Sequence, residues 1–235
     1  MEMNPGSLKK TARLAGLLYL LWILTGFFSM FYMPSQINIR GDAATAAQDI
    51  LSHELLFRTS ILTDLVSSTI WVFMVLVLYR LFKSVDERQA KFMVALVIVQ
   101  IPTIFVMEAF KITSLKIFKG EILKTLELSQ AQDLAMLFLK MNDYVVSALI
   151  LFWGLWLFPL AILVYRSRFL PRFLGIWLAV NGFAFLVLSF TGLLLPQHKD
   201  MAFNIAVPAM LGELVFMLWL LIKGAKAQSV EPANA

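Results

Sequence analysis

Six apolar stretches, each about as long as a bilayer is thick, decide what this chain of 235 residues can fold into. A helix needs about 20 residues to cross the hydrocarbon core, and every backbone amide there needs a partner inside the protein. The alternating pattern of a membrane β-barrel is absent. The sequence therefore predicts an all-α polytopic membrane protein, a bundle of six transmembrane helices over residues 14–33, 59–81, 92–112, 144–165, 173–195 and 201–222.

The composition supports the bilayer as the solvent. Hydrophobic residues make up 60% of the chain and charged residues 15%, whereas soluble domains are typically about 45–50% apolar and about 25% charged. The first apolar run is longer than a signal-peptide core of about 7–15 residues, so we expect a retained helix. Residues 1–226 are expected to form one transmembrane domain, followed by a short disordered cytoplasmic tail, residues 227–235.

Positive charges in the short connections predict the orientation of the chain. Lysine and arginine are enriched in cytoplasmic loops, most strongly where the loops are short. We therefore expect both termini in the cytoplasm and the protein in the cytoplasmic (plasma) membrane. Of the 20 basic residues, those assigned to the cytoplasmic side are Lys9, Lys10, Arg13, Arg80, Lys83, Arg88, Lys91, Arg166, Arg168, Arg172, Lys223 and Lys226.

The two longer connections, residues 34–58 and 113–143, are expected to carry short amphipathic helices on the outer face. Asp42 is placed to cap a helix over Ala43–Phe57. A second interfacial helix is expected over Leu115–Leu128, where lysines alternate with leucine and isoleucine. Ser129 followed by Gln132 resembles a capping box, at the start of a helix that runs unbroken into the fourth span.

Three carboxylates inside the apolar stretches, Asp64, Glu108 and Glu213, are the best indication of a functional site. A charge at the centre of a bilayer costs about 2.5–3.5 kcal/mol on insertion scales, so it normally faces a partner or water. Their depths predict an outward-facing polar ligand-binding pocket, with its mouth and floor formed by Asp64, Glu108, Lys111, Asp143, Gln100, Asn181 and Glu213.

A structural interpretation of the same carboxylates stands beside the pocket. The groups near the interface are equally explained by hydration or by pairing with Lys111. Glu213, at mid-span, has to be protonated, bonded to a neighbour such as Asn181, or exposed to a wet cavity.

Motifs of soluble enzymes are missing. There is no nucleophile turn, no phosphate-binding loop and no dinucleotide fingerprint, so no catalytic residue and no cofactor is predicted. Cysteine is absent, and His53 and His198 each lack a second ligand nearby in sequence, so no metal site is expected. The basic residues are explained by topology, which argues against nucleic acid as a partner.

The function favoured by these features is the binding, and possible transport, of a small molecule or ion. The alternative is an accessory subunit that uses small-residue helix faces and the outer helices to bind another membrane protein. The small-residue row of Gly175, Ala179 and Gly182 is most simply a helix-packing face. A membrane-embedded enzyme acting on lipid is the third hypothesis, although no nucleophile or metal set supports it. In every case the lipid bilayer is itself a partner.

Three stretches resemble an uncharacterised bacterial membrane-protein family, the domain of unknown function 4386. They are Ala12–Gly26 (ARLAGLLYLLWILTG), Gly41–Leu65 (GDAATAAQDILSHELLFRTSILTDL) and Leu163–Gly175 (LVYRSRFLPRFLG). The resemblance implies a multi-pass fold of about six helices in a bacterial inner membrane, and it implies no established activity.

Overall fold

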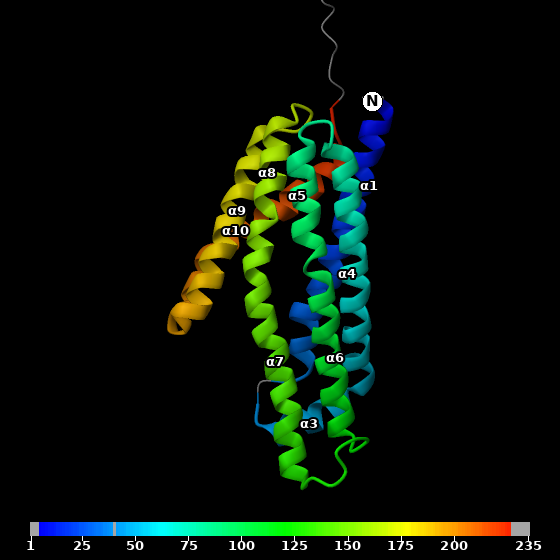
Figure 1. Ribbon diagram of the computed structural model, residues 1–235, viewed down its shortest axis with the longest axis vertical. Helices are drawn as coiled ribbons and strands as arrows, with labels where there is room; N and C mark the ends of the chain where they lie inside the picture. The colour runs from blue at the N-terminus through cyan, green and yellow to red at the C-terminus, as the bar shows by residue number, and fades with distance from the viewer. Residues whose placement is uncertain (1–4, 40, 227–235) are drawn as a thin grey trace, which may run out of the picture. The chain divides into compact units, whose positions relative to one another are not determined.

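A computed structural model describes residues 5–39 and 41–226, and no β-strand occurs in these two ranges. The predicted all-α class is confirmed (Figure 1). The elements in chain order are α1 (Pro5–Phe27), the π-helical turn η1 (Phe28–Tyr32), α2 (Met33–Gln36), α3 (Ala43–Ser52), α4 (Glu54–Phe82), α5 (Glu87–Ile98), α6 (Ile101–Phe118), α7 (Leu128–Leu155), α8 (Leu157–Arg166), α9 (Arg172–Leu194), the 3-10 turn η2 (Pro196–His198) and α10 (Lys199–Ile222). The predicted tail, residues 227–235, lies outside the described residues.

Six helical segments in the described part of the chain are long and apolar enough to cross a membrane. They contain or closely match the six predicted spans. Most are longer than predicted, because the helix continues into polar residues beyond the apolar stretch. The chain is therefore a multi-pass integral membrane protein. The segments are Gly6–Gln36, Glu54–Phe82, Glu87–Phe118, Leu128–Arg166, Arg172–Leu194 and Pro196–Ile222.

Prolines explain two interruptions within these spans. A proline ring inside a helix excludes the hydrogen bond to the carbonyl four residues earlier. Pro102 follows the break between α5 and α6, and Pro159 follows the break between α7 and α8. Pro208, in contrast, lies inside the continuous helix α10. The third and fourth spans are thus each built from two helices in series.

The described chain divides into two compact units, and several helices contribute to both. Within the described residues, the first comprises residues 5–20, 71–98 and 150–226. Its centre is close helix packing at glycine: a Cβ on Gly175 would lie 2.7 Å from the Ala161 carbonyl oxygen, and one on Gly154 would lie 2.7 Å from that of Gly182. The predicted packing role of Gly175 and Gly182 is confirmed, with α8 and the end of α7 as the neighbours of α9.

The second unit comprises residues 21–70 and 99–149, and α3 packs on its apolar core through Ala46, Ala47 and Ile50. The side chain of Asp42 accepts hydrogen bonds from the backbone amides of Ala44 and Thr45, so the predicted cap is confirmed. The helix is shorter than predicted, however. It ends at Ser52, and α4 begins at Glu54.

The predicted interfacial helix over Leu115–Leu128 is wrong. Its first four residues belong to α6, and residues 119–127 form turns. Gly120 ends α6 with a φ of +65°, where its amide donates to the Ile117 carbonyl and the Glu121 amide donates to that of Lys116. This is a Schellman C-cap, which glycine forms without steric cost. The next helix, α7, does run unbroken into the fourth span, as predicted, from Leu128.

Candidate functional site

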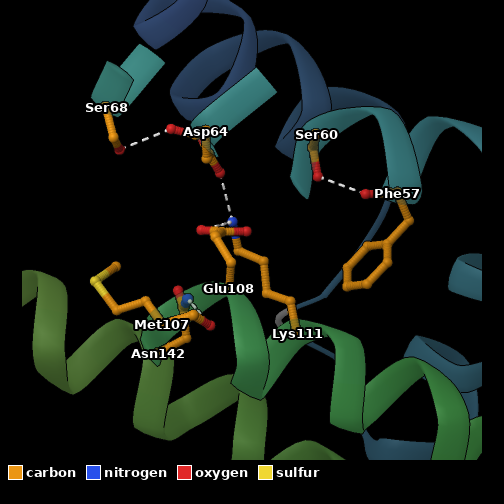
Figure 2. Close-up of polar contacts among 8 residues, drawn as sticks. All are labelled: Phe57, Ser60, Asp64, Ser68, Met107, Glu108, Lys111 and Asn142. Atoms are coloured by element: carbon orange, nitrogen blue, oxygen red, sulfur yellow. Dashed lines mark hydrogen bonds and ion pairs between the residues drawn. The ribbon is translucent and has the colours of Figure 1, made fainter. Parts of the chain in front are cut away.

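Lys111 is the centre of a buried ion cluster in the second unit (Figure 2). Its Nζ lies 2.6 Å from Oδ2 of Asp64 on α4 and 3.1 Å from Oε1 of Glu108 on α6. The side chains are 12% exposed for Lys111, 20% for Asp64 and 3% for Glu108. The cluster therefore links two helices through charges that are largely withdrawn from solvent.

The positions of the three side chains follow from helix geometry. Glu108 and Lys111 are three residues apart on α6, so they lie on the same face. Asp64 reaches Lys111 from α4, 47 positions away in the chain. The hydroxyl groups of the neighbouring serines of α4 bond to backbone carbonyls of their own helix. Ser60 donates to the Phe57 carbonyl and Ser68 to the Asp64 carbonyl, each at 2.8 Å (Figure 2).

The cluster is unbalanced in charge. With both carboxyl groups ionised, Asp64 and Glu108 carry two negative charges against the single positive charge of Lys111. Glu108 Oε2 is buried and has no hydrogen-bond partner among the described residues. A buried carboxylate oxygen without a donor is costly, and the cost falls when the group takes up a proton or a cation.

A second polar cluster lies in the first unit, around Glu213 of α10. The hydroxyl of Tyr19 donates to Glu213 Oε1, and Nδ2 of Asn181 donates to Oε2 at 3.0 Å. Tyr19 and Asn181 are fully buried, and Asn181 Oδ1 has no partner in the described part of the chain. Glu213 is therefore held by two neutral donors, each from a different helix.

The seven predicted site residues thus fall into separate places. Asp64, Glu108 and Lys111 form one cluster, while Asn181 and Glu213 belong to the other. Gln100 is buried at the turn before α6, and Asp143 is exposed on α7. Whether any of them binds a ligand stays a prediction.

Two polar contacts were not anticipated from the sequence. Tyr19 lies within the first apolar stretch, and the only sequence signal for its contact is that a buried tyrosine hydroxyl normally finds a partner. Asn142 lies two residues before the predicted fourth span. Its Nδ2 donates to the Met107 carbonyl at 3.1 Å and so joins α7 to α6 next to Glu108 (Figure 2).

Among residues 5–39 and 41–226, no group of three or more histidine, cysteine, aspartate or glutamate side chains is arranged to hold a metal ion. In the first cluster the cation between the two carboxylates is the ammonium group of Lys111.

Comparison with known proteins identifies the family. The model of a domain of unknown function, DUF4386, matches residues 14–224, which is most of the chain. The chain belongs to this family. An uncharacterised protein of the archaeon Archaeoglobus fulgidus is 32% identical over 83 residues, a match that covers 34% of this chain and 46% of that relative. No solved structure matches significantly. The two matches give a family and no activity.

Proposed function

We propose that this membrane protein binds a small ion at the cluster of Asp64, Glu108 and Lys111, and that binding is a step in moving the ion across the membrane. The observation that carries the proposal is Glu108, whose second carboxyl oxygen is buried beside a cation and has no donor. Ionisable side chains within membrane spans commonly mark ion pathways and proton relays.

The geometry favours a proton as the bound species. Lys111 already contacts both carboxylates at 2.6 and 3.1 Å, so a ligand at this point has to be small. A proton on Glu108 removes the excess negative charge and leaves the Lys111–Asp64 pair intact. We propose this group as the one that gains and loses the proton.

We also propose the wider setting of this activity. The positive charges on one set of connections favour cytoplasmic termini and a bacterial cytoplasmic membrane. Since the chain contains no cysteine, single cysteines introduced near Lys9 and at Gly120 offer a direct topology test. Labelling of position 120 from outside intact cells, without labelling near Lys9, is the expected result.

The alternative proposal, an accessory subunit, does not draw on the small-residue row of α9. Gly175 and Gly182 of that row are covered by Ala161 and Gly154 of the same chain. The small-residue row is therefore already used within the fold.

Infrared difference spectroscopy on the purified protein tests the proposal. A pH step should produce a carboxyl stretching band that disappears in Glu108→Gln and persists in Glu121→Gln, a matched change at an exposed carboxylate. In proteoliposomes, Glu108→Gln should also abolish proton flux driven by a pH gradient. A spectrum without a band assignable to Glu108, together with no flux in the native protein, would rule the proposal out.

A further inference from the structure

A hollow of about 510 Å³ lies between α5 and α8 in the first unit. The two helices run side by side in the bundle (Figure 1). This hollow, called the α5–α8 groove, shares no residue with either polar cluster. It is lined by Arg88, Gln89, Phe92, Phe158, Pro159 and Ile162.

The groove has a polar end and an apolar end. The start of α5 is joined to the end of α8 by the ion pair between Asp86 and Arg166, at 2.8 Å. Arg88 and Gln89 lie in the first turn of α5 at that end. Phe92 follows one turn later, about 6 Å along the axis at 1.5 Å per residue, and Phe158 lies two turns from Arg166. The lining thus changes from cationic to aromatic with depth.

Arg88 is the cation available at the polar end. The neighbouring carboxylates are engaged, because Asp86 pairs with Arg166 and Glu87 pairs with Lys91 at 3.0 Å. Arg88 itself is exposed and makes no ion pair with a described residue. A guanidinium in this position is suited to a phosphate group, which it binds through two parallel hydrogen bonds.

The apolar end lies within membrane-spanning segments. Phe92 belongs to the span Glu87–Phe118, and Phe158 and Ile162 belong to Leu128–Arg166. Phe92 is 54% exposed and Ile162 is 36% exposed, so this surface has to be covered by hydrocarbon. A charged head at the membrane surface above an apolar body at depth is the shape of a phospholipid.

We propose that the α5–α8 groove is a binding site for an anionic phospholipid. The phosphate is held by Arg88, and an acyl chain lies along Phe92, Phe158 and Ile162. Attraction of an anionic lipid to a basic residue near the surface is worth about 1 kcal/mol, which corresponds to roughly a fivefold change in affinity.

The test compares phosphatidylglycerol with phosphatidylcholine, titrated into the full-length protein in neutral detergent micelles and followed by native mass spectrometry. Phosphatidylglycerol should bind more tightly than phosphatidylcholine. Arg88→Gln should weaken phosphatidylglycerol roughly fivefold and phosphatidylcholine by less, because the choline ammonium offsets the charge of the phosphate in phosphatidylcholine. The matched control is Arg80→Gln, at an exposed arginine in the last turn of α4 that lines no part of the groove.

A second variant probes the apolar end without changing the charge. Ile162→Trp should fill the groove and weaken both lipids. Circular dichroism should show that the variant stays folded, and native mass spectrometry should show the same oligomeric state as the unchanged protein. Equal losses in Arg88→Gln and Arg80→Gln would overturn the proposal in favour of diffuse attraction. If inorganic phosphate competes with phosphatidylglycerol and Ile162→Trp has no effect on lipid binding, the site is only an anion contact and the proposal fails. If Ile162→Trp changes the oligomeric state, the groove is an interface between copies of the chain and the proposal also fails.

Discussion

Replacing Lys111 with methionine should destabilise the protein more than any other single change in the ion cluster. The substitution keeps most of the apolar stem and removes the ammonium group that contacts Asp64 at 2.6 Å and Glu108 at 3.1 Å. Two carboxylates are then left facing each other without a cation. Breaking a buried ion pair by removing one partner typically costs about 3–5 kcal/mol.

The expected size follows from the burial of each partner. The Glu108 side chain is 3% exposed, so it bears the full free-energy cost of a buried charge without a partner. The Asp64 side chain is 20% exposed and keeps some contact with solvent. We therefore expect Lys111→Met to lower the free energy of unfolding by about 3 kcal/mol, at the lower end of that range. Glu108→Gln should change it by less than about 1 kcal/mol, because the Lys111–Asp64 pair remains. The double variant should recover part of the loss, since only one carboxylate is left.

Unfolding in mixed micelles with increasing sodium dodecyl sulfate, followed by the fluorescence of the six tryptophans, measures these differences. Lys116→Met is the matched control, because Lys116 lies on the same helix, is exposed, and forms no ion pair with a described residue. A loss for Lys111→Met no larger than for Lys116→Met would refute the electrostatic reasoning. So would a loss of similar size for Glu108→Gln.

Three further changes test other parts of the fold. Gly16→Ala should destabilise the protein by about 1–3 kcal/mol in the same assay, because the added Cβ would lie 2.5 Å from the Leu221 backbone nitrogen. Gly26→Ala is the control and should cause no loss of stability, because a Cβ there would have no atom within 4 Å. Gly120→Ala should cost about 1 kcal/mol because of the positive φ, and a neutral result would contradict the C-cap of α6. Hydrogen bonds from Thr45 hold the pKa of Asp42 below its ordinary value of 3.8. The ionised Asp42 side chain therefore stabilises α3 fully above pH 3.8, and this stabilisation is lost as the pH falls through the lower pKa of the folded state. Amide exchange in residues 43–52 should show this loss on acidification, and Asp42→Asn, which caps without titrating, should not.

The spans were predictable because the bilayer imposes one requirement on length and polarity, and residues 59–81 meet it without reference to any neighbour. The Asp42 cap and the Glu108–Lys111 pair were also accessible, since both depend on spacing within one helix or its first turn. The end of α6 at Gly120 was not predicted, because the amphipathic spacing over Leu115–Leu128 favours a helix and a single glycine is a weak signal against one.

Contacts between helices were less accessible. Pairing of Asp64 with Lys111 was one of two interpretations of the sequence, and the structure shows it. The sequence alone could not select it over hydration, because the contact depends on how α4 rotates against α6. The sequence predicts Asn181 as a neighbour of Glu213, but it does not point to Tyr19, which bonds to the other carboxyl oxygen. Six apolar spans offer many pairings of similar hydropathy, and packing rather than pattern selects among them.

The bonding of Tyr19 to Glu213 has a consequence for the synthesis of the chain. The two residues are 194 positions apart, which at about 5–20 residues per second separates their appearance by about 10–40 s. During that time α1 resides in the membrane without Glu213, the acceptor of the Tyr19 hydroxyl, and without Leu221, against which Gly16 packs. Glu213 must then enter the bilayer and meet Tyr19 before its carboxyl group is satisfied. The contacts of Gly16 and Tyr19 in α1 are therefore completed only when α10 has been made. Chains truncated before α10 should accordingly be degraded faster in the membrane than the full chain.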